Sequence, residues 1–589
     1  MMISIDKPNC IPAILLLFIL GIPAPAFGES VADNEYFRNQ QRQQQLNEQL
    51  RQAPEVRLDA PAAKQDHQLE TGEESCLVIS NIQLAADTPR KFHFLPARLI
   101  QKTSFQPGMC LGVQNLQKLQ TLAQNMVIER GFVTSQVSIE PQQMEAGVLV
   151  LTVTPGKVAK IRFEENDQRP QDAGRISAFP NKFPMQEGDV FNLRDAEQGL
   201  ENLRRLPSTQ SNIRIEPADQ EGYSDIVVEW QQSHPFRLGF GLDDSGSKTT
   251  GKYQASLSLS LDNPLGLSDL LYLGINRDVG GRKASYTDAD GVRTDSGTRG
   301  YNLHYSVPIG YWLLAINHNT YRYHEATEGF TLNYDYHGTS RNTDIALSRT
   351  LYRDARNKTI ATGKLWSKSL HKYIDDYELE VQRRQTAGWA LSLQHRARFG
   401  NAIVYGDIQY KRGTGMRNSL KAPEEFNDDH DVIPGTSRMK IISANLGWDV
   451  PFQMGNQLFS ADGNIAAQWN KTPLTPQDKL AIGGRYTVRG FDGERSLVGE
   501  RGWYWQNNLN WHYRPTHQLY LGLDAGRVSG ESTQGEPDQK LIGAVLGLKG
   551  EHIWRGAWRY DLFAGKPLVK PQGFQTAGTS YGFSLNYDF

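Results

Sequence analysis

Apolar and polar residues alternate with a period of two from about residue 233 to the end of the chain. Between residues 253 and 261, apolar side chains fill every second position, and serine or glutamine fills the positions between them. Turns such as Asn263-Pro264-Leu265-Gly266 separate one alternating run from the next, because glycine, proline and asparagine favour tight reversals of the backbone. Such alternation is typical of strands with one apolar face and one polar face. The pattern predicts an all-β domain over residues 233–589.

The length of this domain fits a barrel that crosses a membrane. A membrane strand needs about 9–11 residues, so about 22 residues per strand and connection give about sixteen strands. The last alternating run ends on the aromatic residue Phe589. A mean hydropathy of −0.54 argues against a bundle of apolar helices, but it is compatible with strands that are polar on one face. We therefore predict a transmembrane antiparallel β-barrel, in preference to a soluble sandwich or propeller.

A small α+β unit is predicted over residues 76–155. Apolar positions at 77–79 and 82 indicate a strand, and apolar residues then recur at helical spacing between Val113 and Val127,. Gly131 ends this helix, and two further strands follow it. The predicted order of elements is β-α-α-β-β.

A second unit of the same kind is predicted over residues 156–232. It starts with a strand, and Asn192 is placed to cap the helix whose apolar positions run from Leu193 to Leu206,. Two short strands then close the unit. The chain therefore has two small α+β domains before the barrel.

The first 28 residues have the features of a secretory signal peptide. Lys7 is basic, residues 11–22 form a short apolar run, and small residues lead to a cleavage position after Gly28. The apolar run is too short to span a membrane as a helix. We predict that residues 1–28 are removed on export.

Residues 29–52 are polar on nearly every side and rich in glutamine and arginine. These residue types favour a helix, but a helix without an apolar face is normally solvated or unstable. The segment is therefore either a frayed leader or a helix lodged in a polar cavity, such as the lumen of a barrel. Residues 53–75 contain two prolines and mixed charges, which indicates a flexible linker.

Charge and cysteine content narrow the classes further. The formal net charge is −2, so the chain as a whole has no electrostatic attraction to nucleic acid. After loss of the signal peptide two cysteines remain, Cys76 and Cys110, and an even number in an oxidising compartment favours a disulfide. Two unpaired thiols or half of a metal site are the alternatives, but no other Cys or His cluster lies nearby in the sequence. We predict a disulfide and no metal.

The glycine-rich stretch 482–491 contains the motif Val488-Arg489-Gly490-Phe491. Its three glycines permit close backbone approaches, which suits a loop pressed against a wall better than a free surface loop. A buried arginine at position 489 requires a carboxylate partner.

Taken together, these features resemble the TpsB family of two-partner secretion transporters, of the haemolysin or contact-dependent inhibition type. The resemblance covers the signal peptide, polar helix, two POTRA-like units, barrel and motif, in that order. Three more segments match the family pattern: Asn263–Gly266, Tyr305–Trp312 and Leu523–Gly526. The resemblance implies an outer-membrane protein of a Gram-negative bacterium that exports a large partner exoprotein in unfolded form.

The resemblance also implies roles for particular residues. The inward loop would carry Val488, Arg489, Gly490 and Phe491, with Asp524 on the barrel wall as the partner of Arg489. Glu494, Glu500 or another acidic residue could replace Asp524. Residues 29–52 would plug the lumen, the POTRA-like units would bind the exoprotein client, and the terminal Phe589 would be read by the barrel assembly machinery. The outer face of the barrel would contact outer-membrane lipid.

Other functions remain open at this point. An insertase of the same superfamily shares the loop motif but usually has more POTRA units, and a porin or receptor needs neither POTRA units nor the motif. A catalytic role has little support, because residues 246–252 approach a nucleotide-binding loop but Tyr253 stands where Ser or Thr is needed,. We predict no catalytic residue, no cofactor and no nucleic-acid partner.

Overall fold

The computed structural model describes most of the chain after residue 30. The described residues are 31–51, 55–58, 69, 75–103, 105–140, 147–165, 180–282, 285–287, 291, 293–328, 333–422, 425, 435–536 and 538–589. The predicted signal peptide, residues 1–28, lies outside them. Within them, no helix has the length and apolar character needed to cross a membrane.

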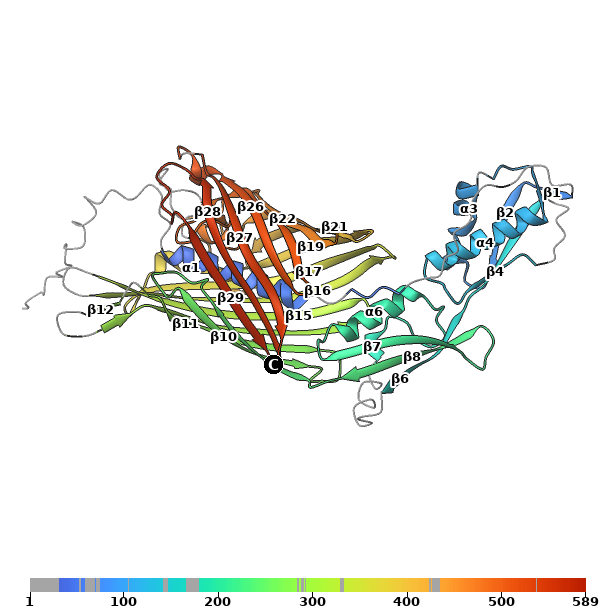
Figure 1. Cartoon of the computed structure of the whole chain (residues 1–589), viewed down its shortest axis with the longest axis horizontal. Coiled ribbons are helices and arrows are strands. Elements are labelled where there is room, and N and C mark those ends of the chain that lie inside the picture. The colour runs from blue at the N-terminus through green and yellow to red at the C-terminus, as the bar shows by residue number, and fades with distance from the viewer. Residues whose placement is uncertain are drawn as a thin grey trace, which may run out of the picture.

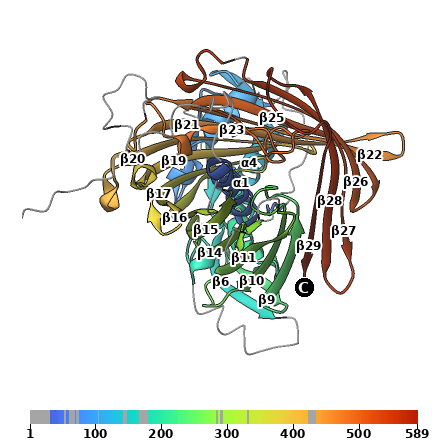
Figure 2. The same ribbon diagram turned by 90° about the vertical axis from the view of Figure 1, so that its left-hand side faces the viewer.

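Sixteen long antiparallel strands of the described residues form a closed barrel, in which β29 returns to pair with β9. Figure 1 shows the barrel beside the two α+β domains, and Figure 2 views the barrel from the end remote from those domains. The prediction of an antiparallel barrel of about sixteen strands after two α+β domains is confirmed. The strands are β9 (Phe236–Asp243), β10 (Tyr253–Asp262), β11 (Leu270–Gly280), β14 (Gly297–Ile309), β15 (Trp312–Thr327), β16 (Tyr334–Arg353), β17 (Asn357–Ile374), β19 (Arg384–Phe399), β20 (Ala402–Thr414), β21 (Lys440–Met454), β22 (Gln457–Asn470), β25 (Arg501–Arg514), β26 (His517–Ser529), β27 (Lys540–Ile553), β28 (Ala557–Val569) and β29 (Ser580–Asp588).

Alternation along each strand sorts apolar and polar side chains to opposite faces of the barrel. Leu257 on β10 is 45% exposed and lies opposite Ile275 on β11 and Phe240 on β9. Gln254 and Ser260 of the same strand are buried. A barrel with an apolar outer face and a polar lumen is expected in a bilayer, where the outer face contacts lipid.

Shorter elements decorate the barrel at the end remote from the α+β domains. Strands β12 (Ser285–Thr287) and β13 (Arg293–Asp295) form a small hairpin between β11 and β14. Strand β18 (Tyr377–Glu378) adds a two-residue pairing to β17.

The second α+β domain contains a three-stranded sheet in the order β6-β8-β7, packed against one helix. Its elements are β6 (Lys157–Glu165), η2 (Pro180–Lys182), α6 (Leu193–Arg204), β7 (Thr209–Pro217) and β8 (Tyr223–Gln232). Asn192 caps α6 as predicted, because its side chain accepts a hydrogen bond from the N–H of Arg194 at 2.8 Å,. The strand β6 pairs in parallel with β8, which requires the helix-bearing crossover between them,.

The second domain rests directly on the barrel. Asn202 of α6 donates to the carbonyl oxygen of Gly310, at the turn between β14 and β15, at 2.8 Å. Arg205 donates to the hydroxyl of Ser306 on β14 at 2.8 Å, and Asn181 donates to the carbonyl of Pro308 at 2.8 Å. These contacts fix one end of the barrel to this domain.

The first α+β domain contains a two-stranded ribbon beside its three-stranded sheet, and the sequence pattern did not separate the two. The predicted strand at 77–82 is two strands, because the chain turns at Ser80, whose N–H donates to Gly147 O at 2.7 Å. Strand β1 pairs with β3, and β2 pairs with β5 in a separate sheet. The elements are β1 (Cys76–Ile79), β2 (Asn81–Ala86), α2 (Pro89–Phe92), α3 (Leu95–Thr103), β3 (Met109–Gly112), α4 (Val113–Glu129), β4 (Gln136–Ser138) and β5 (Val148–Thr154).

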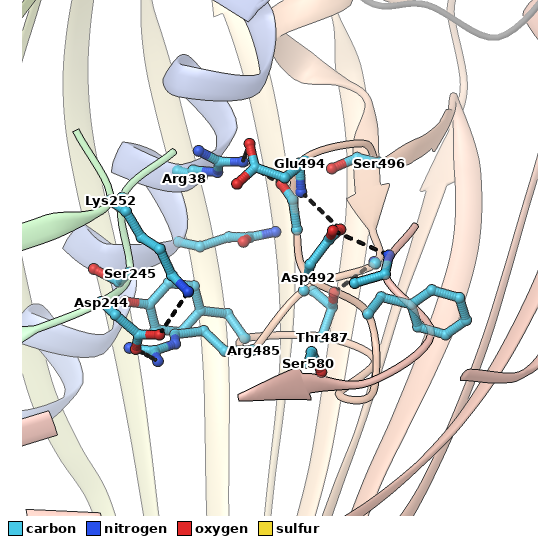
Figure 3. Close-up of a pocket in the computed structure, with 18 of the residues that line it drawn as sticks. Arg38, Asp244, Ser245, Lys252, Arg485, Thr487, Asp492, Glu494, Ser496 and Ser580 are labelled. Carbon is cyan, nitrogen blue, oxygen red and sulfur yellow. Dashed lines mark hydrogen bonds and ion pairs between the residues drawn. The ribbon is translucent and has the colours of Figure 1, made fainter. Parts of the chain in front are cut away.

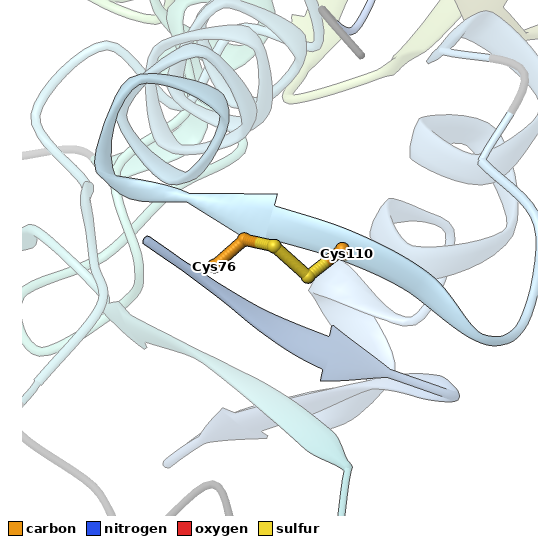
Figure 4. The surroundings of a disulfide bond; sticks show 2 residues. All are labelled: Cys76 and Cys110. Atoms are coloured by element: carbon orange, nitrogen blue, oxygen red, sulfur yellow. A yellow bond between two sulfur atoms is a disulfide. The ribbon is translucent and has the colours of Figure 1, made fainter. Parts of the chain in front are cut away.

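A disulfide between Cys76 and Cys110 joins β1 to β3, with a Cα–Cα separation of 5.3 Å (Figure 4). The two strands are otherwise held by a four-pair ladder, and a two-stranded ribbon alone is marginally stable. The bridge closes a 34-residue separation that includes α2 and α3. The disulfide therefore reduces the number of unfolded conformations that are available to about half of this domain.

Replacing both cysteines by serine should destabilise the first domain by roughly 3–4 kcal/mol, the chain-entropy value for a loop of this length. Amide hydrogen exchange in β1, β3 and α3 of the full-length protein measures this loss. A barrel strand such as β22 serves as the internal reference, and unchanged exchange in the first domain would contradict the stabilising role.

A helix and an inward loop in the barrel lumen

Helix α1 (Val31–Arg51) lies inside the barrel (Figures 1 and 2). At about 1.5 Å per residue its 21 residues span about 31 Å,, which matches the thickness of a bilayer core. The frayed-leader alternative is therefore wrong for these residues. The helix is held there by polar contacts with the wall and by Tyr36 and Phe37, which pack with Leu370 and Ala481 in a buried apolar cluster.

The segment between β22 and β25, residues 471–500, folds back toward the barrel wall. We call it the inward loop. It contains η6 (Pro476–Asp478) and a short hairpin of β23 (Leu480–Ile482) with β24 (Leu497–Gly499). The motif Val488–Phe491 lies at the tip of this hairpin, where the loop meets β26, β27 and β28.

Arg489 is held by the wall through a bidentate pair with Asp524 on β26. Its Nε donates to Asp524 Oδ2 at 2.7 Å and its Nη2 donates to Oδ1 at 2.8 Å. The backbone N–H of Arg489 also donates to Oδ2 at 2.9 Å. Asp524 is 0% exposed, so both charges depend on each other for stabilisation in a poorly solvated site.

Two asparagines of β25 complete the arginine site. Nη1 of Arg489 donates to Asn508 Oδ1 at 2.8 Å, and Nη2 donates to the backbone carbonyl of Asn507 at 3.1 Å. The sequence analysis missed both residues. Their chemistry is ordinary for a polar strand face, and only the register of β25 against β26 brings them to the guanidinium.

The remaining motif residues pack the loop tip against the wall. Val488 and Phe491 are buried with Phe574 in one apolar cluster. Gly490 has φ 102°, and a Cβ at this position would lie 2.7 Å from Lys566 O on β28 and 3.0 Å from Gly543 Cα on β27. Only glycine permits this contact.

The alternative partners named for Arg489 have other roles. Glu494 faces helix α1, where one of its oxygens lies 3.7 Å from Arg38, and Glu500 lies 3.1 Å from Lys479 within the inward loop. A third arginine–carboxylate contact joins Arg485 of the loop to Asp244, just after β9. The loop is therefore attached both to the barrel and to the helix.

Glu35 anchors the first turns of α1 to the barrel. Its carboxylate is 2% exposed and accepts hydrogen bonds from the Tyr321 hydroxyl on β15 at 2.7 Å and from Thr250 Oγ1 at 3.0 Å. Arg38, one turn along, lies 3.2 Å from the same carboxylate. The sequence analysis did not single out Glu35, because an isolated acidic residue in a polar helix has no local signature.

Arg38 also connects the helix to the inward loop, as Figure 3 shows. It donates to the backbone carbonyl of Gly493 and approaches Glu494. A cavity of about 150 Å³ lies beside these groups, between α1, the loop after β9 and the inward loop. Burial raises the pKa of the Glu494 carboxyl, although Arg38 acts in the opposite direction.

Polar side chains extend the contact along the helix. Asn39 donates to Asn319 Oδ1 on β15 at 3.3 Å, Gln41 donates to the carbonyl of Ala481 at 3.3 Å, and Arg42 donates to Ser245 Oγ at 2.9 Å. Each of these bonds replaces hydrogen bonds to water, so its net contribution to stability is modest. No group of three His, Cys, Asp or Glu side chains among the described residues is arranged to hold a metal ion.

The geometry defines a class of protein: a membrane-spanning barrel with two α+β domains at one end, a lumen filled by a polar helix, and a loop fastened to the inner wall. Known proteins share these features. The sequence profile described as "Haemolysin secretion/activation protein ShlB/FhaC/HecB" matches residues 222–550, and POTRA-domain profiles match residues 77–156 and 157–217. The chain belongs to this family of outer-membrane transporters.

Individual relatives support the assignment. The chain is 32% identical to the outer membrane transporter CdiB-2 of Burkholderia pseudomallei (strain 1026b), over 96% of each chain. It is 25% identical to the hemolysin transporter protein ShlB of Serratia marcescens, over 86% of this chain and 84% of that one. The solved structure of CdiB from Acinetobacter baumannii covers 95% of this chain and 100% of its own, with 29% identity and a TM-score of 0.81.

The protein is therefore an outer-membrane transporter of two-partner secretion, with its POTRA domains in the periplasm. The turns of the barrel that touch α6 are periplasmic, and the inward loop enters from the extracellular end. Insertase and porin functions, which the sequence left open, are not those of this family.

Replacing Glu35 by alanine should loosen α1 in the lumen. The change removes the buried carboxylate that accepts hydrogen bonds from Tyr321 and Thr250. Hydrogen bonds to a charged group contribute about 2 kcal/mol, so the population without a docked helix should rise roughly thirtyfold. Channel conductance in planar bilayers measures this population. The control is Gln45→Ala, at an exposed position of the same helix, and equal conductance of the two variants would contradict the anchoring role.

Proposed function

We propose that this transporter exports one large partner exoprotein in unfolded form through the lumen that α1 occupies. The exoprotein belongs to the class that includes haemolysins, adhesins and contact-dependent inhibition toxins. The observation that carries the proposal is the filling of the lumen. A polar, hydrogen-bonded helix occupies a passage lined by polar side chains, so its departure would open a route for an extended chain.

Helix α1, within the proposed plug segment 29–52, is the resting-state plug. Its contacts range from charged ones at Glu35 and Arg38 to amide hydrogen bonds, and they are shared between the barrel wall and the inward loop. The plug therefore leaves as a unit once the shared contacts are lost. Residues 53–75 connect it to the first POTRA domain.

The Arg489–Asp524 pair positions the inward loop while the helix moves. It ties the loop tip to β26 independently of α1, whereas Glu494 and Gly493 of the same loop contact Arg38 of the helix. Losing either member of the pair would strand a buried charge. The loop would then lose its register against the wall, and with it the lining of the transport path.

The POTRA domains receive the client in the periplasm. In the described residues the sheet orders β2-β5-β4 and β6-β8-β7 leave an outer strand on each side of both sheets. Such edges can add an extended client segment through backbone hydrogen bonds, without special side chains. Folding of the client outside the cell makes the passage one-way. Transport of this kind requires no catalytic group, and we assign none.

Two further contacts belong to the proposal. Residues on the outer face of the strands, such as Leu257 and Trp505, contact outer-membrane lipid,. The exposed terminal Phe589, whose N–H donates to Leu238 O at 2.9 Å beside the β29–β9 closure, is the group that the barrel assembly machinery reads.

Replacing Arg489 by alanine should abolish secretion of the partner exoprotein, because the uncompensated Asp524 carboxylate costs about 3–5 kcal/mol and dislodges the loop. Mass spectrometry of the culture medium identifies the exoprotein as the large protein lost when the transporter gene is deleted.

The matched control for that experiment is Arg527→Ala. Arg527 lies near the extracellular end of β26, the strand that carries Asp524, and forms an exposed pair with Asp538. Such pairs contribute about 0–1 kcal/mol. Secretion at the wild-type level by Arg489→Ala, with equal barrel abundance in the outer membrane, would disprove the role of the pair. Loss of other outer-membrane proteins instead of an exoprotein would overturn the proposed function.

A further inference from the structure

Residues 55–58, four residues after α1 ends at Arg51, lie in a groove between α6 of the second POTRA domain and the periplasmic turn that joins β16 to β17. This differs from the flexible linker expected for residues 53–75. Val56 is 3% exposed, and Leu58 packs against the apolar core of the second POTRA domain. We call these residues the linker segment.

Side chains of the groove bind the backbone of the linker segment. The N–H of Val56 donates to Glu201 Oε1 at 3.1 Å, and the N–H of Leu58 donates to Glu197 Oε1 at 2.9 Å. The carbonyl of Val56 accepts a hydrogen bond from Arg353, at the end of β16. Because the two N–H groups are two residues apart, they point the same way only in an extended chain.

The second oxygen of each carboxylate is held by the barrel. Glu197 Oε2 accepts from Arg353 Nε at 2.9 Å, and Glu201 Oε2 lies 2.8 Å from Arg353 Nη1 and also contacts Lys358 at the start of β17. Burial alone would raise the pKa of Glu201, but Lys358 and Arg353 more than offset it, so the pKa is lowered. Each carboxylate thus has one oxygen directed at the backbone of the linker segment and the other held by the barrel.

The linker is not what attaches this domain to the barrel. Asp195 of α6 accepts a hydrogen bond from Tyr311, and Asn202 donates to Gly310 O, both without the linker segment. Arg353 and Lys358 also reach α6 directly. The groove therefore keeps its walls when the linker segment departs.

The groove and the plug are coupled by chain length. Glu55 is four residues after Arg51, and an extended chain spans at most about 3.5 Å per residue, or about 14 Å in total. While the linker segment is bound, the C-terminal end of α1 must therefore stay within about 14 Å of Glu55. Release of the segment is therefore a condition for the helix to leave.

We propose that this groove is a receptor for extended polypeptide, occupied by the transporter's own linker at rest, and that an extended segment of the client displaces the linker and so frees the plug. The inference rests on the proposed function. The displacing segment needs two backbone N–H groups in extended register and one small apolar side chain at the position of Val56. The contacts of Arg57 with Ala355 O and Arg356 O, and of Glu55 with Arg396, add affinity for the linker itself.

Peptide binding to the purified full-length protein tests the receptor. The probe is a fluorescent peptide of residues 54–60, and the protein carries Gly-Ser-Gly-Ser in place of residues 55–58 so that the groove is vacant. We expect saturable binding to this variant and at least about tenfold weaker binding to the wild type, whose groove is filled. A peptide N-methylated at the positions of Val56 and Leu58 should bind at least about tenfold more weakly, since each loses a hydrogen bond to a charged acceptor.

A peptide with serine in place of Glu55 and Arg57 distinguishes a backbone receptor from a linker-specific site. We expect it to retain binding within about fivefold, because Glu55 and Arg57 pair with each other at 2.5 Å, so that replacing both leaves neither of these two charges stranded,. Equal binding of the N-methylated peptide, loss of binding by the serine peptide, or equal binding by wild type and vacant variant would each overturn the inference.

A second measurement avoids changes to the groove. Val56→Pro removes the N–H that Glu201 accepts, so the variant should show a higher open-channel conductance than Val56→Thr, which keeps the N–H and the shape. Equal conductance would contradict the coupling of groove and plug. Because peptide binding is read in purified protein, its failure would leave the secretion result intact, and a missing exoprotein would leave the binding result intact.

Discussion

The bidentate ion pair between Arg489 and Asp524 is the constraint on which the interior of this barrel depends. A fully buried carboxylate has no solvent to replace its partner, so the pair fixes the tip of the inward loop against β26,. From that fixed point the loop reaches across to α1 through Gly493 and Glu494. Helix α1 thus lies in a passage lined in part by a loop whose tip this ion pair fixes.

The inward loop and helix α1 are held by different sets of contacts. The loop tip is held by the bidentate Arg489–Asp524 pair,. Helix α1 is held by single charge-assisted bonds of Glu35 and Arg42 to hydroxyl groups and by amide contacts such as that of Asn39,. At the periplasmic end, Glu197, Glu201 and Arg353 bind the chain that follows the helix through its backbone. The two ends of the plug are therefore held by different chemistry, one in the lumen and one at the junction of the second POTRA domain with the barrel.

The sequence predicted the architecture well because its signals are periodic. Alternation over residues 253–261 and the cap at Asn192 depend only on local geometry, and the motif arginine implied a carboxylate because buried charge is costly. The contacts of Glu35, Asn508 and Val56 could not be predicted, because each joins segments far apart in the chain through strand register or helix placement. Ser80 split a predicted strand in two through a hydrogen bond to Gly147 that no local pattern encodes.

The central claim is that α1 must leave the lumen for secretion, and a reversible lock tests it most directly. Asn39 and Asn319 face each other across the helix–wall contact, so the cysteines of an Asn39→Cys/Asn319→Cys variant can be joined by a short thiol-reactive cross-linker that contains a cleavable disulfide, and they can be released by a mild reductant. The account predicts that exoprotein secretion stops when the cross-link forms and returns on reduction, while each single-cysteine variant secretes under both conditions. Undiminished secretion by the fully cross-linked transporter would contradict it.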